Sequence, residues 1–399
     1  MTEQRAESAL PVGSRVGDIL TIFRRHASLT RADVARQTGL SRATVNARLN
    51  ALLTAGLLVA DGEEAPTRGR PAGSFAFNAS RGVLLVADIG ATAMRTVLCD
   101  LSGRIIEERS ESADVTDGPE VILAVAQVLF DQMLSAAGHG ADEVHGVGLD
   151  VPGPVDIESG QVISPPIMTG WDRFDIPGWF ASHYACPVLV DKDVNAMAFG
   201  ENRIVHPDVP NMLFVKIGTG VGSGIIANGQ TYRGADGAAG DIGHNQIPIR
   251  DDAPAPLCRC GNTGCVEAYA GGWALVRDLR AEGHDITTVD EAVGLVRAGD
   301  PAAVRLARRA GRILGAALAD AVSLLNPRVI VVGGQLAHAE EQIFAGMREM
   351  IYRRSLPLAT RQLRIVPSRL DRRAGVIGLT LLVADHIFDA DRIDQIIAS

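Results

Sequence analysis

Three glycine-rich turns, each directly after an apolar strand-like run, constrain the fold of this chain most strongly. They lie at residues 88–92 (DIGAT), within 216–225 (KIGTGVGSGI) and at 333–334, after the apolar run 329–332. Glycine lets the backbone approach phosphate, a hydroxyl can donate to phosphate, and an aspartate can hold hydrated Mg²⁺. One such turn is common in hairpins, but three predict an α/β protein with a nucleotide cleft between two lobes. The expected phosphate-contacting residues are Asp88, Gly90, Thr92, Gly218, Thr219, Gly220, Gly222, Gly333 and Gly334.

A cysteine cluster lies in the same part of the chain. Cys258, Cys260 and Cys265 fall within eight residues, and His244 precedes the first of them by fourteen. Three thiolates and one imidazole predict a closed tetrahedral zinc site, which would be structural because no ligand position is left open. The alternative is a chance group of reduced cysteines beside a histidine. Five cysteines in 399 residues, three of them crowded together, do not indicate a disulfide framework.

The first 80 residues follow the pattern of a winged helix-turn-helix. Thr30 is expected to cap a helix over 31–38, Gly39 to end it, and Ser41 to cap a second helix over 42–55. The second helix has one apolar and one polar face, as in a recognition helix whose first turns reach base edges in the major groove. Its expected DNA-contacting residues are Arg42, Thr44, Asn46 and Arg48.

Two short strands, at 57–60 and 74–78, are expected to form the wing. Arg68 and Arg70 lie on a glycine–proline loop between them and suit a narrow minor groove and its phosphates. A three-helix interaction module with a solvated basic face would share part of this pattern. The ordered set of caps, turn, polar face and basic wing favours double-stranded DNA as the partner.

Charge and composition agree with this division. Residues 1–80 carry ten arginines and seven acidic groups (+3), so the net charge of −9 leaves −12 on the rest of the chain. With 47% hydrophobic and 21% charged residues, the chain is not fully disordered, collagenous or a coiled coil. No apolar run approaches the ~18–20 residues that cross a bilayer, and the N-terminus lacks an apolar signal segment. A soluble, cytoplasmic protein without a membrane partner is therefore expected.

These motifs, in this order, resemble the ROK family (repressor, open reading frame, kinase), in its regulator branch with an N-terminal winged helix. The matching segments are DIGATAM at 88–94, GVGLDVPGPV at 146–155, DKDVNAMAFGE at 191–201, GTGVGSGI at 218–225, GDIGH at 240–244, CRCGNTGCVE at 258–267 and NPRVIVVGG at 326–334.

The resemblance implies an actin-like, hexokinase-like pair of lobes related to ribonuclease H. The winged helix would span 1–80 and the kinase-like domain 81–399. Its first lobe would comprise about 81–197 plus 375–399, and its second lobe about 198–374 with the zinc loop. A long lobe helix is expected over 302–325.

The resemblance also assigns roles to residues of a sugar pocket. In the sugar kinases of the family, the residue matching Asp193 is the general base that accepts the proton of the sugar hydroxyl. His244 would bind zinc through one nitrogen and a sugar hydroxyl through the other, and Trp171 would offer a stacking surface. The implied sugar-binding set is Asp193, Asn195, Asp241, His244 and Glu267.

The chain departs from the kinase pattern at several positions. Ala91 and Ala93 stand in the first phosphate turn, where kinases usually carry Gly and then Lys or Asn. Lys192 and Pro166 stand where Asn is usual, and Asp241 replaces a Glu. These changes weaken ATP phosphate binding more than they weaken a sugar pocket, since catalysis needs donor, Mg²⁺ and acceptor aligned.

The sequence therefore favours a transcriptional repressor of carbohydrate metabolism that senses a sugar or sugar phosphate in a kinase-like pocket. It would hold structural Zn²⁺, bind a DNA operator as a homodimer or higher oligomer, and associate with the nucleoid. Two alternatives stay open. One is an active sugar kinase that uses ATP and Mg²⁺, and the other is a regulator controlled by a protein partner.

Overall fold

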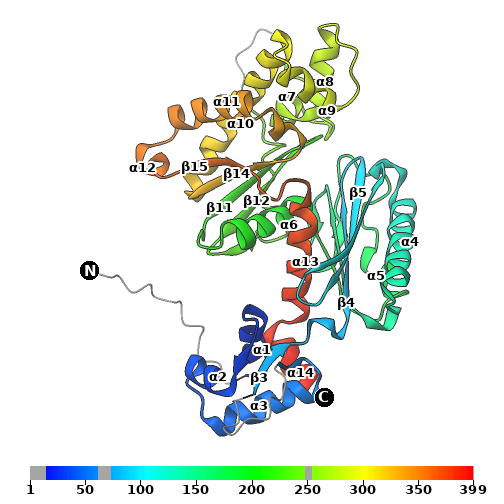
Figure 1. Cartoon of the computed structure of the whole chain (residues 1–399). Helices are drawn as coiled ribbons and strands as arrows, with labels where there is room; N and C mark the ends of the chain where they lie inside the picture. Colours follow the sequence, from blue (N-terminus) through cyan, green and yellow to red (C-terminus); the bar gives the residue numbers. More distant parts are fainter. Residues whose placement is uncertain (1–14, 62–72, 248–253, 399) are drawn as a thin grey trace.

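The structure, a computed structural model, describes residues 15–61, 73–247 and 254–398 (Figure 1). An N-terminal winged helix is followed by two α/β lobes, each built on a five-stranded sheet. This is the fold class that the sequence predicts.

The winged helix confirms the predicted capping pattern. Thr30 Oγ1 accepts a hydrogen bond from the N–H of Asp33 at 3.2 Å, and Asp33 Oδ2 accepts one from the N–H of Thr30 at 2.9 Å. Gly39 ends α2 with φ +69°, and Ser41 Oγ accepts from the N–H of Thr44 at 3.2 Å. The sequence did not predict the short strand β1, which pairs with β3. The elements are α1 (Val16–Arg25), β1 (Leu29–Thr30), α2 (Arg31–Thr38), α3 (Arg42–Thr54), β2 (Leu58–Asp61) and β3 (Ser74–Phe77).

The two lobes repeat one strand order. It is β10-β7-β4-β5-β6 in the first lobe and, read in the same direction, β15-β14-β11-β12-β13 in the second. In each sheet three consecutive strands pair antiparallel to one another. The fourth strand pairs in parallel with the first, and the fifth pairs in parallel with the fourth. The first sheet comprises β4 (Val83–Ile89), β5 (Ala93–Asp100), β6 (Ile105–Ser112), β7 (Val144–Val151) and β10 (Val188–Lys192). The second comprises β11 (Met212–Ile217), β12 (Val221–Ala227), β13 (Gln230–Tyr232), β14 (Val329–Gly333) and β15 (Arg364–Pro367).

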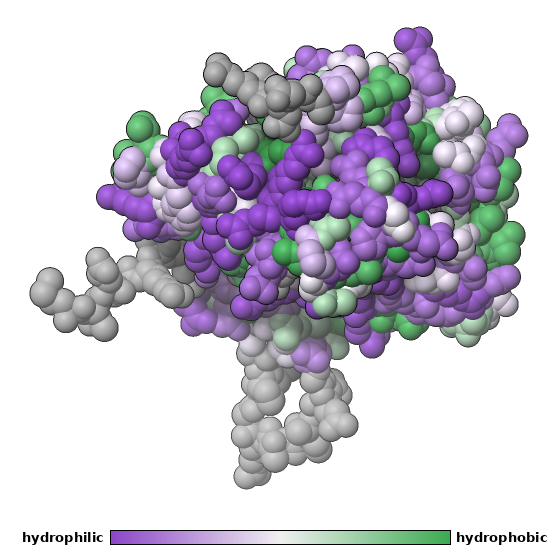
Figure 2. Space-filling model, turned by 90° about the horizontal axis from the view of Figure 1, so that it is seen from above, coloured by the Kyte–Doolittle hydropathy of each residue, from purple (hydrophilic) through white to green (hydrophobic). Residues whose placement is uncertain are grey.

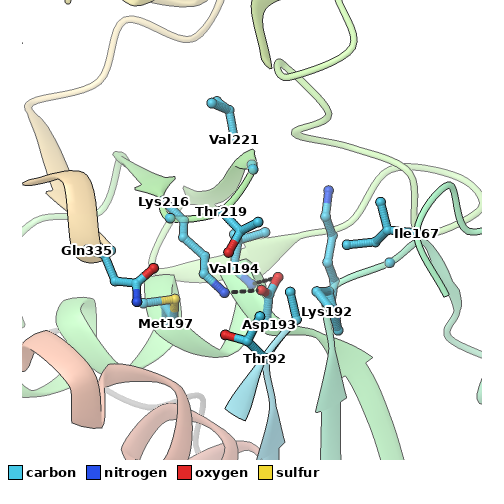
Figure 3. A pocket seen from close by; sticks show the side chains of 18 of the residues that line it. Thr92, Ile167, Lys192, Asp193, Val194, Met197, Lys216, Thr219, Val221 and Gln335 are labelled. Carbon is cyan, nitrogen blue, oxygen red and sulfur yellow. Dashed lines mark hydrogen bonds and ion pairs between the residues drawn. The ribbon is translucent and has the colours of Figure 1, made fainter. Parts of the chain in front are cut away.

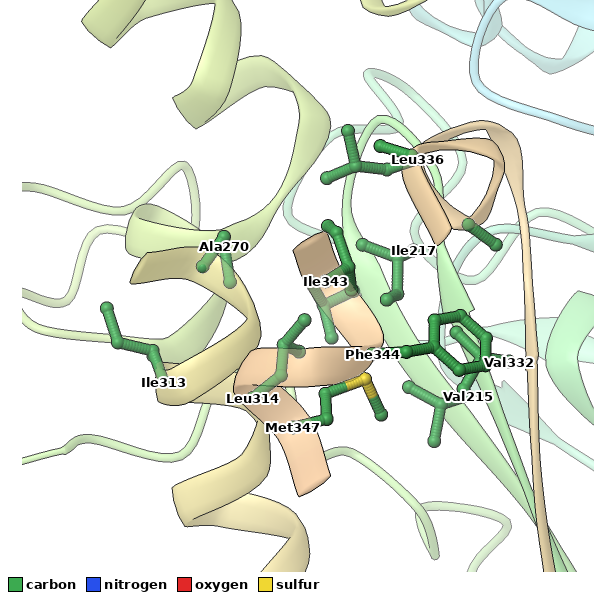
Figure 4. Packing of buried hydrophobic residues seen from close by; sticks show 14 of the residues in the cluster. Val215, Ile217, Ala270, Ile313, Leu314, Val332, Leu336, Ile343, Phe344 and Met347 are labelled. Carbon is green, nitrogen blue, oxygen red and sulfur yellow. The ribbon is translucent and has the colours of Figure 1, made fainter. Parts of the chain in front are cut away.

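The largest hydrophobic cluster lies in the second lobe, where two helices cover the sheet (Figure 4). Leu314 of α10 and Phe344 of α11 pack with Val215 of β11, and all three are 0–1% exposed. The helix α10 (Pro301–Leu325) covers the expected 302–325. The other helices of this lobe are α7 (Val266–Ala270), α8 (Gly272–Ala281), α9 (Val289–Arg297), α11 (Glu340–Arg354) and α12 (Pro357–Thr360).

Two helices, α6 (Asp193–Gly200) and α13 (Ala374–Ile387), lie between the lobes (Figure 1). Helix α6 contacts β11 and β12, α13 contacts β4 and β7, and the two helices pack against each other. Their backbones touch because glycines face the contact. A Cβ on Gly378 would lie 1.7 Å from the carbonyl oxygen of Ala196, and a Cβ on Gly200 would lie 2.9 Å from that of Ala374.

The winged helix shares a hydrophobic core with the first lobe. One cluster of buried residues runs from Phe23 and Leu49 of the winged helix to Leu379 of α13. At the end of α13, the rings of Phe388 and Phe77 meet edge to face with centroids 5.1 Å apart. The winged helix is therefore packed onto the body rather than tethered by a loop alone.

The last helix, α14 (Ala390–Ala398), packs against α1. The N–H of Gly17 donates to Asp394 Oδ1 at 2.9 Å, and a Cβ on Gly17 would lie 2.3 Å from the carbonyl oxygen of Ala390. The sequence assigned the whole of 375–399 to the first lobe. Helix α13 packs on that sheet, but α14 joins the winged helix instead.

One expectation about apolar runs is wrong. Within the described residues, α4 (Pro119–Ala137) is long and apolar enough to cross a membrane by length and composition. Its inner face carries Leu123, Phe130 and Met133, which are buried in the core of the first lobe. That packing accounts for its apolar character. On the face seen in Figure 2, hydrophobic residues are dispersed among hydrophilic ones.

The α6–α13 contact predicts that Gly378→Ala destabilises the protein by about 3 kcal/mol, because the new methyl group would meet the backbone of α6. Gly294→Ala is the matched control. Gly294 is exposed within α9 and has no atom within 4 Å of an added Cβ, so alanine there should stabilise by ~0.5–1 kcal/mol. Urea denaturation measures both. Equal effects of the two substitutions would contradict the close contact.

Candidate functional site

A cavity of about 400 Å³ lies between the two lobes (Figure 3), a volume in the range of small-molecule sites. Residues from both sheets, from α6 and from the turn before α13 line it. All three predicted glycine turns reach it. The expected phosphate and sugar residues that line it are Asp88, Gly90, Thr92, Asp193, Gly218, Thr219, Gly220, Gly222, Asp241, His244, Glu267 and Gly334.

A row of carboxylates crosses the first sheet at the cavity. Asp88 of β4 is the register partner of Asp150 of β7, which is the register partner of Asp191 of β10. Asp193 follows at the start of α6 and is 4% exposed. Several acidic groups are thus held close together at the carboxyl ends of three parallel strands, where they need compensating charge.

Lys216 of β11 supplies that charge from the second lobe. Its Nζ lies 2.5 Å from Asp193 Oδ2 (Figure 3). Burial disfavours the charged form of Lys216, but the facing carboxylates of Asp193 and Asp88 outweigh it and raise the pKa of the ammonium. The pair joins the two lobes across the cavity.

The pKa values of two carboxyls of this row, Asp88 and Asp150, are both raised. Burial raises the pKa of Asp150 well above its usual range, and the neighbouring Asp88 and Asp193 add to the shift. Burial also raises the pKa of Asp88, against the opposing effect of Lys216. Asp150 is 0% exposed and its carboxyl oxygens have no hydrogen-bond partner among the described residues within ordinary bonding geometry.

The opposite side of the cavity is built around Glu267 of α7. Its Oε2 accepts from the N–H of Val221 at 3.0 Å, and its Oε1 accepts from Nε1 of Trp273 at 3.2 Å. A Cβ on Gly220 would lie 2.4 Å from Glu267 Oε2, so a side chain at that position of the turn would displace the Glu267 carboxylate. Carboxylate, indole and His244 together form a surface suited to hydroxyl groups and a sugar ring.

Three expected site residues lie elsewhere. Asn195 is 1% exposed and does not line the cavity; its Nδ2 donates to Asp191 Oδ1 at 2.8 Å and so positions the strand end. Gly333 is packed against Phe214, whose Cζ would lie 2.6 Å from an added Cβ. Trp171 is wholly buried and donates through Nε1 to the carbonyl of Val115 at 3.0 Å, so it cannot stack on a ligand.

The sequence missed Lys216, Trp273 and Arg259, all of which line the cavity. The guanidinium of Arg259 lies over the Trp273 ring at 5.0 Å. One signal was available for Lys216: it is one of only two lysines in the chain and stands directly before the second glycine turn. Trp273 follows the cysteine motif by eight residues and had no pattern that set it apart from a core tryptophan.

The four expected metal ligands converge beside the cavity. One donor atom each from His244, Cys258, Cys260 and Cys265 lies within 4.8 Å of the others. The Sγ atoms of Cys260 and Cys265 are 3.7 Å apart, as are Cys258 Sγ and His244 Nδ1. A tetrahedral zinc ion with Zn–S bonds of about 2.3 Å sets its sulfur ligands ~3.8 Å apart. The donor set and its spacing are therefore compatible with a structural zinc ion.

The recognition-helix residues differ in how freely they face solvent. Arg42 and Asn46 are exposed on α3. Thr44 Oγ1 is hydrogen-bonded to Ser41 Oγ at 2.8 Å, and Arg48 is half-buried with its Nη1 enclosed. The expected wing residues Arg68 and Arg70 lie outside the described residues.

The carboxylate row predicts that Lys216→Met destabilises the protein by about 3–5 kcal/mol, because one partner of a buried ion pair is lost. The loss of unfolding free energy caused by Lys216→Met should be larger at pH 8 than at pH 5.5. A carboxyl whose pKa is raised by folding stabilises the folded state at low pH and loses that effect as the pH rises through its folded pKa. Lys192→Met removes the only other lysine and should change stability by less than about 0.5 kcal/mol. Urea denaturation at both pH values measures this, and equal effects of the two substitutions would rule out the proposed charge balance.

Comparisons with known proteins agree on one family. A family model described as "ROK family" matches residues 84–386, and one described as "Winged helix-turn-helix DNA-binding" matches residues 16–59. The xylose repressor of Bacillus subtilis is 26% identical over 366 residues, which cover 92% of this chain and 93% of the repressor.

Two solved structures are similar as well. A ROK family transcriptional regulator described as a homologue of the Escherichia coli MLC protein superposes with a TM-score of 0.82 at 25% identity, over 96% of this chain and 98% of its own. A ROK family glucokinase from Streptomyces griseus, in complex with glucose and AMPPNP, has a TM-score of 0.65 at 28% identity and covers 76% of this chain and 99% of its own. The chain belongs to the ROK family and carries a winged helix-turn-helix DNA-binding domain ahead of the ROK domain.

Proposed function

We propose that the protein is a transcriptional repressor that binds operator DNA through its winged helix and senses a sugar in the cavity without phosphorylating it. The similarity to repressors over nearly the whole chain supports the DNA-binding role. The glucokinase similarity covers only 76% of the chain, a share too small to take in the winged helix as well. A repressor regulated by a sugar uses both the winged helix, to bind DNA, and the kinase-like domain, to bind the sugar.

The observation that carries the sensing role is the path of α13. Asp371 and Arg372, directly before this helix, line the cavity, and a Cβ on Gly375 would lie 2.3 Å from Asp88 Oδ2. At the other end, Asp385 pairs with Arg24 of α1 at 3.1 Å. A ligand that moves the lobes relative to each other would therefore move the support of the winged helix, which is a population shift between two packings.

The ion pair at Asp193 supports sensing rather than catalysis. A general base must present a lone pair to the hydroxyl proton, and both oxygens of Asp193 already accept a hydrogen bond: Oδ2 from Lys216 Nζ and Oδ1 from the N–H of Val194. The same ammonium adds positive charge beside Asp88, where a hydrated Mg²⁺ would have to bind. The chain's own lysine thus supplies positive charge near Asp88 and binds Asp193.

An ATP-dependent sugar kinase is the second candidate. In its favour, Asp88, Gly90, Thr92 and Asp193 all line one cavity. If that activity is present, the protein converts ATP to ADP in the presence of a sugar and Mg²⁺. A coupled ADP assay separates the two candidates.

We further propose that His244, Cys258, Cys260 and Cys265 hold a zinc ion, which would fix the loop that carries Arg259 beside the cavity. When bound, the metal would act structurally, since all four tetrahedral positions would be filled by the protein. We also propose that the protein works as a dimer in the cytoplasm, bound to its DNA, because one winged helix reads only half of an operator.

The DNA-binding role predicts that Arg42→Ala weakens operator binding at least tenfold at fixed salt, because Arg42 is exposed at the start of the recognition helix. Arg353→Ala is the matched control. It removes the same charge from an exposed position on α11, in the second lobe, and should leave affinity within twofold. Fluorescence anisotropy of labelled upstream DNA measures both. Equal losses would mean that binding is unspecific or uses another surface.

The zinc proposal predicts that Cys260→Ser lowers the bound zinc from one ion per chain and lowers the melting temperature, because one of four ligands is lost. Cys186→Ser is the control, since Cys186 is a free, half-buried cysteine outside the cluster. Elemental analysis of protein purified without chelators gives the zinc content. Unchanged zinc in Cys260→Ser would refute this ligand set.

A further inference from the structure

The chain uses lysine only at the cavity. Of its 38 basic residues, 36 are arginine and two are lysine, Lys192 and Lys216. Both line the same cavity. Lysine carries a compact point charge on a flexible stem, whereas arginine presents a planar fork. Every other basic residue of the chain that carries a long cationic side chain is arginine, so two lysines in one cavity indicate that this cavity needs ammonium groups rather than guanidinium groups.

The two lysines differ in charge balance. Lys216 is neutralised by Asp193 at 2.5 Å. The ammonium of Lys192 has no ion pair or hydrogen bond to any described residue. Its side chain points away from the Lys216–Asp193 pair and toward Ile167 in Figure 3.

The carboxylates next to Lys192 in the chain are already engaged. Asp191 Oδ2 accepts from Arg233 Nε at 3.0 Å and Nη2 at 2.5 Å, and its Oδ1 accepts from Asn195 at 2.8 Å and from the N–H of Lys192 at 2.8 Å. Asp193 is bound to Lys216. The backbone of Lys192 is thus held in place while its charge stays uncompensated.

Most other charged groups around the cavity have partners. Arg95 pairs with Glu108, and His338 lies 3.0 Å from Asp371. Arg372 lies 3.9 Å from Asp290. Glu267 is held by hydrogen bonds from Val221 and Trp273.

Among the described residues, the cations of the cavity lining that lack an ion-pair partner are then Lys192 and Arg259, and the carboxylates that lack one are Asp88, Asp241 and Glu267. The guanidinium of Arg259 is stacked on Trp273, and Asp241 is exposed. Lys192 is the one cation among them that no neighbouring group engages.

We propose that the effector is a sugar that carries an anionic group, a carboxylate or a phosphate, and that Lys192 binds this group. The proposal rests on the proposed function, since it names the chemical class of the ligand in the same cavity. The sugar hydroxyls would face Asp241, His244 and Glu267. A neutral sugar would leave the half-buried ammonium of Lys192 without a counter-charge in the cavity.

The test is calorimetric titration of the full-length protein with matched sugars at constant ionic strength, which fixes charge screening. The pairs are glucose with glucuronate, galactose with galacturonate, and glucose with glucose 6-phosphate. The expected result is that, in at least one pair, the anionic sugar binds at least tenfold more tightly than its neutral parent. In Lys192→Gln, which keeps the length and polarity of the side chain, this preference should fall to within twofold while the neutral parent binds as before.

Arg259→Gln is the matched control variant, because it removes the other unpaired cation. If it abolishes the preference and Lys192→Gln does not, the assignment to Lys192 is wrong. If neutral parents bind as tightly as the anionic sugars, the effector class is wrong, although the sugar-sensing function stands. If no sugar of either kind binds, both the effector class and the sensing function fall. The uronate and phosphate pairs show which anionic group is recognised.

Discussion

The close contact between α6 and α13 is the constraint on which the rest of the structure depends. Gly378 and Gly200 let the two backbones touch, and this places both helices in the narrow space between the two sheets. Helix α6 brings Asp193 to the cavity, and α13 runs from the cavity to the winged helix. Because packed helices shift as units rather than deform continuously, a change at the cavity has a rigid route to the DNA-binding domain.

The charge arrangement in the cavity explains how a kinase-like fold can serve for sensing. Carboxylates such as those clustered here can hold the Mg²⁺ of a metal–nucleotide complex together with the phosphates. In this chain Lys216 enters that cluster from the second lobe and pairs with Asp193. The pair both compensates the buried charge and ties the lobes together. A ligand that competes for Asp193 would therefore alter the lobe contact directly, with no chemical step.

Much of the fold was predictable from local sequence. The caps at Thr30 and Ser41, the glycine turns after apolar strands and the Cys258–Cys265 spacing are short-range signals, and the structure contains each of them. What the sequence could not supply are long-range pairings. Asp193 and Lys216 are 23 residues apart, and Gly17 and Asp394 are 377 apart. Trp171 and Trp273 look alike in sequence, but only tertiary packing buries the first and brings the second to the cavity.

The most direct test of the account measures DNA affinity and catalysis in the same samples. Labelled upstream DNA bound to the wild-type protein is titrated with neutral and anionic sugars at fixed salt, with and without ATP and Mg²⁺, and phosphorylated sugar is assayed in parallel. The account predicts that one sugar shifts the DNA affinity about 5–150-fold, the range of typical allosteric coupling. The shift should be the same with and without ATP, and no product should form. Formation of phosphorylated sugar with no change in DNA affinity would contradict it.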